Sequence, residues 1–504
     1  MDTLQKKESI ICDDFVSDEE DTKNDDNQVS FTQRAKDFDF KKLFAEFVIK
    51  KDMYVFSKES SLEKDYELWD ELGRGAYGIV YKAIHKTTGK ERAVKQIPKA
   101  QIKKNQYKRF INEVTALKQL DHHNVVKLFE VYEENSHVYL VQEICYGGEL
   151  YDRILDQEYF SEQQAVPYFK QIVQAILYCN KNKICHRDLK PENFMFKTKD
   201  KDSKLKLIDF GLSRSYYKTE NNLDLLGKLV RMKTYAGTAF FVAPEVIREN
   251  YNQSCDMWSA GVILYIMLWG YPPFYGENNN DILKSVLNGE YDYNDEVWDK
   301  VSPEAKDLIN RCLCAEDQRI RPKEALNHAW LEIADDHSTV SKQHMERLRD
   351  FQKAKKLKKA ALAYIASRAT DEDISEELKI FESLDKNKDG YITLKELREG
   401  MADNSNLEEI SEILKGVDVD ANGAINYTEF IAATMDQHKF FKKVKDAFDV
   451  FDRNGDGVID PEELMEVLEN EDVELMKLII QECDQDDDNK ITLEEFIQAV
   501  LKKE

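Results

Sequence analysis

Residues 186–193 read His-Arg-Asp-Leu-Lys-Pro-Glu-Asn. These residue types, in this order, suit the transfer of a phosphoryl group to a hydroxyl. Asp188 can orient the hydroxyl and accept its proton, and Lys190 can neutralise charge on the transferring group. Asn193 offers a hard oxygen ligand for Mg²⁺. The stretch predicts a catalytic loop inside a larger phosphotransfer domain.

Two short motifs follow the catalytic loop. Asp209-Phe210-Gly211 matches D-F-G, in which the carboxylate of Asp209 would be a second Mg²⁺ ligand. Ala243-Pro244-Glu245 matches A-P-E. Both lie after residues 186–193, in the order that a phosphotransfer domain requires.

A glycine-rich stretch precedes the catalytic loop. Residues 73–80 fit G-x-G-x-x-G-x-V, and glycine lets the backbone close tightly over phosphates. A simple turn or a dinucleotide-binding loop could share this pattern. Here the stretch lies between two predicted strands and does not open a helix, which disfavours the dinucleotide interpretation. Lys95 follows in the next strand and could hold phosphates if Glu113 fixed its position, although either residue alone could be an ordinary surface charge.

With all these motifs in one order, residues 66–330 resemble a eukaryotic protein kinase domain. The resemblance implies a bilobal fold, ATP and Mg²⁺ as cofactors, and serine/threonine specificity. It implies catalytic roles for Lys95, Glu113, Asp188, Lys190, Asn193 and Asp209. The implied nucleotide-contacting positions are Leu72, Gly73, Arg74, Gly75, Ala76, Tyr77, Gly78, Val80, Ala93, Lys95, Glu143, Cys145 and Glu149.

The same resemblance assigns three further roles. Glu143 and Cys145 would bind adenine through their backbone groups. Glu149 and Glu192 would read arginine on a protein substrate. Glu245 and Arg321 would form a structural ion pair, and Asp256 and Trp258 would also be structural.

The last third of the chain contains an internal repeat. Acidic loops begin at Asp385, Asp418, Asp452 and Asp484, at intervals of 33, 34 and 32 residues. Each loop follows D-x-[DN]-x-[DN]-G-x5-E or a close variant, so each predicts an EF-hand calcium site. The predicted ligands are Asp385, Asn387, Asp389, Tyr391, Thr393 and Glu396; Asp418, Asp420, Asn422, Ala424, Asn426 and Glu429; Asp452, Asn454, Asp456, Val458, Asp460 and Glu463; and Asp484, Asp486, Asp488, Lys490, Thr492 and Glu495.

Two details of the repeat are specific predictions. The apolar eighth positions, Ile392, Ile425, Ile459 and Ile491, should pair the loops through short strands. In the fourth loop Asn489 replaces the turn glycine, and asparagine tolerates the left-handed conformation better than other non-glycine residues. We still expect this loop to bind calcium.

A basic amphipathic helix is predicted between the two modules, within residues 331–370. Apolar residues from Met345 to Ile365 recur near one helical face, and Arg and Lys cover much of the rest. Such a helix is typical of segments that bind calmodulin-like grooves, although it could also be a simple spacer.

A kinase domain, a basic junction at 331–370 and four EF-hands at 371–504 together resemble the calcium-dependent protein kinases of plants and protists. The resemblance implies a multidomain α+β protein with an all-α calmodulin-like domain. It also implies that the junction blocks the substrate site until Ca²⁺ binds, without separate calmodulin. The alternatives are a non-catalytic calcium sensor and a kinase that is always active.

The loop between D-F-G and A-P-E departs from the usual pattern of this family. Residues 212–242 span 31 positions, which is long, and Thr234 stands where many members carry an acid. The positive charge of Arg187 would attract a negative charge at this position, so we predict that full activity requires phosphorylation of Thr234. An unmodified threonine on a solvated loop is the alternative.

Composition bounds the remaining possibilities. Residues 371–504 hold 15 basic and 38 acidic residues, which accounts for most of the net charge of −25 and argues against nucleic acid as a partner. The eight scattered cysteines indicate reduced thiols. We expect residues 1–60 to be an acidic, mostly disordered extension with a short helix near its end. The lack of a signal peptide, membrane span or acceptor glycine for myristoylation predicts a cytoplasmic protein. The family resemblance implies substrates with Arg or Lys near Ser or Thr, and we expect the protein to be a monomer.

Overall fold

The computed structural model describes residues 55–58, 60–75, 78–101, 114–115, 117–215, 231–234, 236–331, 342–370, 373–400, 407–436, 441–468 and 472–501. The predicted short helix near residue 45, the insertion at residues 216–230 and the positions Ala76, Tyr77 and Glu113 lie outside these ranges. Residues from Val48 onward form one compact unit, which holds all of the described residues.

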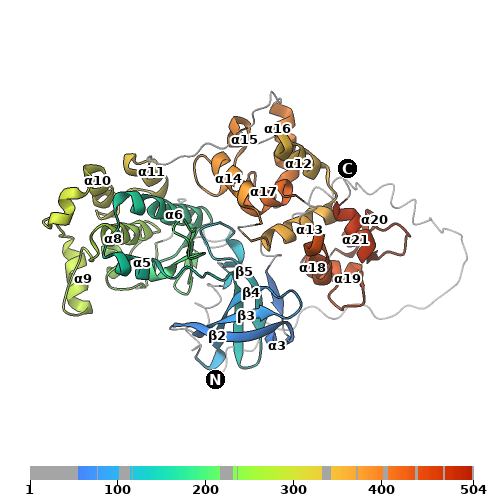
Figure 1. The fold of residues 1–504 in the computed structure, drawn as a ribbon, viewed down its shortest axis with the longest axis horizontal. Helices are drawn as coiled ribbons and strands as arrows, with labels where there is room; N and C mark the ends of the chain where they lie inside the picture. The colour runs from blue at the N-terminus through green and yellow to red at the C-terminus, as the bar shows by residue number, and fades with distance from the viewer. Residues whose placement is uncertain are drawn as a thin grey trace, which may run out of the picture. The chain divides into compact units, whose positions relative to one another are not determined.

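A six-stranded sheet lies at the start of this unit, in the strand order β1-β5-β6-β4-β3-β2 (Figure 1). In β4 the adjacent residues Val94 and Lys95 are both buried, so the sheet takes up the lysine as well as the apolar side chain. The register places Lys95 opposite Val80 on β3 and Leu140 on β6. The strand bounds are β1 (Phe56–Lys58), β2 (Tyr66–Gly75), β3 (Gly78–His85), β4 (Glu91–Pro98), β5 (Leu128–Glu133) and β6 (His137–Gln142).

Strand β1 is an element that the sequence did not suggest within residues 1–60. It pairs in parallel with β5, so the sheet begins before residue 66. Lys58 anchors it, because its Nζ lies 2.9 Å from Asp65 Oδ2 and 3.0 Å from the Tyr132 hydroxyl. Lys58 and Tyr132 are 74 residues apart, so no local sequence pattern predicts their contact.

Helices dominate the next part of the chain, as the sequence predicted. Helix α8 is buried along nearly its whole length and contacts α6 and α10. Helix α6 starts at a capping box formed by Ser161 and Gln164. The helices are α3 (Leu62–Asp65), α5 (Leu150–Gln157), α6 (Glu162–Lys181), α7 (Pro244–Ile247), α8 (Cys255–Trp269), α9 (Asn279–Asn288), α10 (Pro303–Cys312) and α11 (Pro322–Leu326), with short 3-10 turns at Lys99–Gln101, Pro191–Asn193, Glu296–Lys300 and Ala329–Leu331.

Two small ladders hold the catalytic loop between these helices. Strand β7 pairs with β10, and β8 pairs with β9. They bracket residues 186–193, so the loop is fixed at both ends. Their bounds are β7 (Ile184–Cys185), β8 (Phe194–Phe196), β9 (Leu205–Leu207) and β10 (Arg214–Ser215).

The C-terminal part consists of helix–loop–helix units. Their loops pair through the predicted short strands, because Ile392 lies opposite Ile425 and Ile459 opposite Ile491. This pairing confirms the prediction made from the eighth loop positions. The elements are α14 (Ser375–Leu384), β11 (Tyr391–Ile392), α15 (Leu394–Gly400), α16 (Leu407–Val417), β12 (Ile425–Asn426), α17 (Tyr427–Thr434), α18 (Phe441–Phe451), β13 (Val458–Ile459), α19 (Pro461–Val467), α20 (Val473–Gln481), β14 (Ile491–Thr492) and α21 (Leu493–Leu501).

The junction contains two helices, where the sequence predicted one. Helix α12 (Lys342–Lys353) ends before Lys355, whose backbone is extended and caps α13 (Lys356–Ser367). Helix α12 packs against α16 and α17, whereas α13 packs against α17, α18, α20 and α21. The break lets each half of the segment follow a different set of EF-hand helices. Within the described residues, none of the helices is both long and apolar enough to cross a membrane.

Candidate functional site

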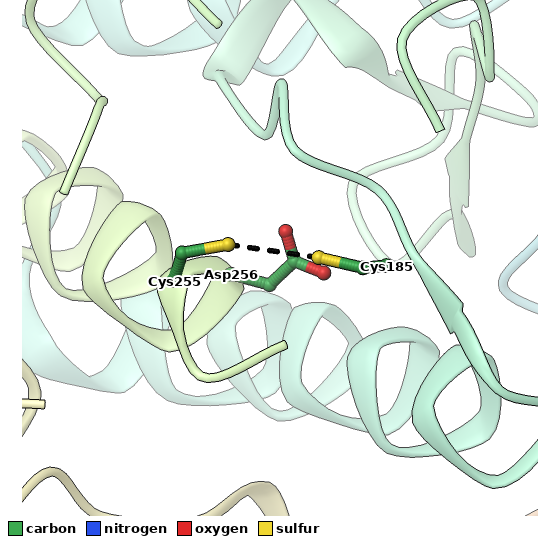
Figure 2. Close-up of side chains that lie close together, drawn as sticks. All are labelled: Cys185, Cys255 and Asp256. Carbon is green, nitrogen blue, oxygen red and sulfur yellow. Dashed lines mark hydrogen bonds between the residues drawn. The ribbon is translucent and has the colours of Figure 1, made fainter. Parts of the chain in front are cut away.

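The catalytic loop is held by backbone hydrogen bonds to Asp256 at the start of α8. One oxygen of Asp256 accepts from the N–H of His186 and the other from the N–H of Arg187, both at 2.9 Å. Figure 2 shows this carboxylate beside the sulfurs of Cys185 and Cys255, which lie 3.6 Å apart. Burial raises the pKa of the Cys185 thiol. Because both Asp256 oxygens already accept these hydrogen bonds, the three side chains act as structural support and do not form an open metal site.

The groups around Asp188 converge on its carboxylate. Its Oδ1 accepts a hydrogen bond from the Thr238 hydroxyl at 2.9 Å, and its Oδ2 lies 3.4 Å from Lys190 Nζ. The Asn193 side-chain amide donates to the Asp188 carbonyl at 2.7 Å. This arrangement offers one carboxylate base and one ammonium at the same point, which suits proton removal from a hydroxyl and charge neutralisation.

Lys95 and Asp209 face each other across the two lobes. Lys95 Nζ lies 3.1 Å from Asp209 Oδ1, and the positive charge of Lys95 lowers the pKa of Asp209. Asp209 lies two residues after the end of β9 and has a φ of 56°, a left-handed backbone conformation. The residue is therefore ionised and aimed at the strand that carries Lys95. The expected pair of Lys95 with Glu113 lies outside the described residues.

The described glycines of the glycine-rich stretch lie at the end of β2 and the start of β3, with Gly75 opposite Gly78. A Cβ on Gly78 would come within 2.0 Å of the Gln96 carbonyl oxygen, so the close approach of β3 to β4 requires glycine. Val80 and Ala93 lie on the neighbouring strands β3 and β4, and Leu72 near the end of β2 is exposed. The residues that could border a nucleotide therefore come from one end of the sheet.

Ion pairs hold Glu143, in the segment directly after β6, against two lysines. The Glu143 carboxylate lies 2.8 Å from Lys197 Nζ and 3.2 Å from Lys206 Nζ. Burial opposes ionisation, but the charges of these lysines outweigh it and lower the pKa of Glu143. Sequence reasoning missed both lysines, because Lys206 lies in a fully buried strand where no pattern marks a charged residue. The side chain of Glu143 is structural, which leaves only its backbone for a ligand.

Acidic side chains gather where substrate arginine was predicted to bind. Burial, then Asp152 and Glu192, raise the pKa of Glu149. Within the described residues, Glu192 Oε2 is buried and has no hydrogen-bond partner. The cluster is electrostatically suited to a cationic group, and Asp152 is an addition that the sequence did not suggest.

The predicted ion pair between Glu245 and Arg321 is wrong. Glu245 pairs with the buried guanidinium of Arg319, and Arg319 Nη2 lies 3.1 Å from Glu245 Oε2. Arg321 is exposed and starts α11 instead. The two arginines are separated by one residue, and the buried one, Arg319, is the partner of Glu245.

Thr234 lies next to the guanidinium of Arg187, as its role would require. Arg187 Nη1 donates to Thr234 Oγ1 at 3.2 Å and to the Tyr251 hydroxyl at 3.1 Å. The Tyr251 hydroxyl in turn donates to the Thr234 carbonyl at 2.8 Å. Thr234 is exposed, so its hydroxyl is accessible while a cation lies beside it.

The four acidic loops adopt one geometry. The first aspartate of each loop accepts a hydrogen bond from the N–H at position six, at 2.8 to 2.9 Å: Gly390 to Asp385, Gly423 to Asp418, Gly457 to Asp452 and Asn489 to Asp484. Asn489 has a φ of 61° and so replaces the glycine in the same left-handed conformation, as predicted. The twelfth-position glutamates fold back over their loops, as in the hydrogen bond from Asn454 N–H to Glu463 at 2.9 Å.

The donor atoms of the loops fit a divalent cation. Carboxylate oxygens of Asp418, Asp420 and Glu429 lie within 4.8 Å of one another, as do those of Asp484, Asp486 and Asp488. Asp484 Oδ1 is buried without a hydrogen-bond partner among the described residues. Such crowding is unfavourable without a counterion, and hard oxygens are the ligands that Ca²⁺ prefers.

The basic residues of the junction are engaged by the EF-hand helices. Arg347 Nη1 donates to the Thr434 carbonyl at 2.7 Å, and Arg349 pairs with Glu409 at 2.9 Å. Lys359 Nζ donates to the Gly416 carbonyl at 2.7 Å. The apolar residues of α13, including Leu362 and Ile365, are almost fully buried.

Comparisons with known proteins agree with both halves of this description. Residues 66–331 match the family model for a protein kinase domain, and residues 349–435 and 441–501 match the model for an EF-hand domain pair. Calcium-dependent protein kinase 5 of Plasmodium falciparum is 40% identical over 446 residues, which cover 85% of this chain and 76% of that protein. Calcium-dependent protein kinase 3 of Plasmodium berghei is 39% identical, covering 89% and 82%, and calcium-dependent protein kinase 4 of Plasmodium falciparum is 37% identical, covering 89% of each.

Proposed function

Because this chain belongs to the calcium-dependent protein kinases and is a calcium-activated serine/threonine kinase that uses ATP, Mg²⁺ and Ca²⁺, we propose roles for its individual residues. Asp188 orients the substrate hydroxyl and accepts its proton. Lys190 neutralises charge on the transferring phosphoryl group. Thr238 holds the Asp188 carboxylate in place through its 2.9 Å hydrogen bond.

The nucleotide is held between the lobes. Lys95 contacts the phosphates, and the glycine-rich turn at residues 73–80 covers them. The backbone groups of Glu143 and Cys145 bind the adenine base. Asn193 and Asp209 would hold Mg²⁺, which supplies charge neutralisation at the phosphates. The 3.1 Å ion pair between Lys95 and Asp209 supports this placement, because it brings the phosphate ligand and the metal ligand together.

The substrates are proteins with Arg or Lys near the acceptor Ser or Thr. Glu149, Asp152 and Glu192 form the acidic cluster that would bind the cation. In a Glu192→Gln variant we expect a higher KM for an arginine-containing peptide and an unchanged KM for a peptide with alanine at that position. Equal effects on both peptides would contradict the assignment.

Calcium controls the enzyme through the junction. In the calcium-free state, residues 331–370 block the substrate site with their basic side chains, and calcium opens EF-hand grooves that take up the junction. The observation that carries this proposal is the engagement of Arg347, Arg349 and Lys359 by EF-hand groups. Basic side chains held there cannot contact the substrate site at the same time.

Two truncations test the proposal. A chain ending at residue 331 should phosphorylate a peptide with or without calcium, because both the block and its release are removed. A chain ending at residue 370 should be inactive under both conditions, because the block remains without the domain that releases it. Equal activity of the two chains, with cooperative thermal unfolding of both, would refute autoinhibition by the junction.

Full activity also requires phosphate on Thr234. The 3.2 Å hydrogen bond from Arg187 supports this role, since a phosphate at the same position would gain a charge-assisted interaction. A Thr234→Ala variant should keep its calcium response but lose most of its peak activity. Normal peak activity in that variant would remove the proposal.

The buried thiols of Cys179, Cys185, Cys255 and Cys312 support a reducing, cytoplasmic location, and the enzyme acts as a monomer.

A further inference from the structure

We propose that Lys181 of the kinase domain competes with calcium for the first EF-hand loop and lowers the calcium affinity of that site. Lys181 is the last residue of α6, and its ammonium group forms an ion pair with Asp389 Oδ2. Asp389 is the fifth residue of the loop and a predicted calcium ligand. The inference deepens the proposed calcium regulation and rests on calcium binding by this loop.

The contact involves more than one pair of charges. The Tyr391 hydroxyl donates to Asn182 Oδ1 at 3.0 Å, and the ring of Tyr391 stacks on Tyr178 with centroids 5.7 Å apart. A Cβ on Gly390 would come within 2.5 Å of the Tyr178 ring, so the turn of the loop lies directly against α6. Three consecutive loop residues, 389–391, therefore contact the end of one kinase helix.

The first loop differs from the other three in this respect. Asp389 is buried, whereas the fifth positions of the other loops, Asn422, Asp456 and Asp488, are exposed. A kinase contact thus reaches the ligand set of one site and leaves the fifth positions of the others open to solvent. Any effect of Lys181 on calcium binding should be confined to the first site.

Both oxygens of Asp389 are engaged in this arrangement. Its Oδ1 accepts from the Tyr391 N–H at 3.1 Å, and its Oδ2 pairs with Lys181. A calcium ion in the loop must share or displace this pair, and the ammonium charge repels it in either case. By thermodynamic reciprocity, calcium at the first site weakens the contact with α6 by the same factor. Lys181 thereby couples the calcium affinity of the first site to the contact between loop residues 389–391 and the end of α6.

Calcium titration of the full-length protein tests the inference directly. Isothermal calorimetry of a Lys181→Met variant should show one of the calcium-binding steps tightened by about tenfold at low ionic strength, the order expected for loss of a unit charge close to a divalent ion. The increase should shrink in high salt, because Lys181 is partly exposed. Lys323→Met, which removes an exposed charge from α11, should leave the titration unchanged.

A second background keeps the test specific to the first site. In a Glu396→Gln variant, which loses the twelfth-position ligand of that loop, the effect of Lys181→Met should disappear. An unchanged or weaker titration for Lys181→Met in the normal background would overturn the inference, as would a change that persists with Glu396→Gln. Because the readout is calcium binding, it is independent of kinase activity. If calcium stimulates kinase activity but Lys181→Met leaves the calcium titration unchanged, this inference alone is refuted. If calcium does not stimulate kinase activity, the regulatory proposal alone is refuted.

Discussion

Leu362 in α13 connects the packing of the junction to the calcium response. It is 1% exposed, and its helix packs against α17, α18 and α21 of the EF-hands. Replacing a buried leucine by alanine removes about 2–5 kcal/mol of packing free energy. In Leu362→Ala this loss falls on the arrangement in which the EF-hand helices enclose the side chain, which we assign to the active form. The variant should therefore shift the protein toward the inhibited form.

The size of the shift follows from this loss. A loss of about 2.7 kcal/mol changes the equilibrium between the two forms by about 100-fold. If all four calcium ions contribute to the switch, the free calcium needed for half activation rises by the fourth root of that factor, about threefold. Fewer coupled ions would give a larger rise.

The assay is peptide phosphorylation across buffered free calcium concentrations. Leu362→Ala should move the midpoint to higher calcium and keep the activity at saturation. Leu407→Ala provides the matched control, since Leu407 in α16 is 54% exposed and its loss should leave the midpoint unchanged. A midpoint for Leu362→Ala that stays in place, or moves to lower calcium, would refute the claim that α13 is held by the EF-hands in the active form.

Three other substitutions probe the catalytic site, the large lobe and the junction. Asp188→Asn should reduce kcat by about 10²–10⁴-fold while calcium titration stays normal, because it removes only the proton acceptor. Arg319→Met should lower Tm far more than Arg321→Met in thermal melts, since it leaves Glu245 buried without its partner at a cost of about 3–5 kcal/mol. Burial lowers the pKa of Lys356 from 10.5 to about 8. Between these two pH values the folded protein binds fewer protons than the unfolded chain, so the free energy of unfolding should rise as the pH increases. Chemical denaturation at several pH values should show a smaller rise for Lys356→Met.

Local motifs predicted the parts of the structure that depend on local sequence. The catalytic loop and the calcium loops each rely on residue types at fixed spacing, and the structure brings the residues within each loop together. Asn489 is a good example, because its tolerance for a left-handed backbone could be argued from its side chain alone. The pairing of Ile392 with Ile425 followed from the repeat in the same way.

Contacts between distant segments account for what the sequence left open. Strand β1 is anchored by residues more than 70 positions away, and the choice of Arg319 over Arg321 depends on burial beside Glu245. The junction forms two helices that both contact α17, while α12 also contacts α16 and α13 also contacts α18, α20 and α21, which no periodicity within the segment records. Lys181 and Asp389 are 208 residues apart, so their pairing emerges only from the folded chain.

The most direct test of calcium control is the activity of the purified full-length protein on an arginine-containing serine peptide, with ATP and Mg²⁺. The protein should be nearly inactive in EGTA and strongly active in micromolar free calcium, without added calmodulin. Equal activity under both conditions would contradict calcium control by the EF-hands and leave only the kinase assignment.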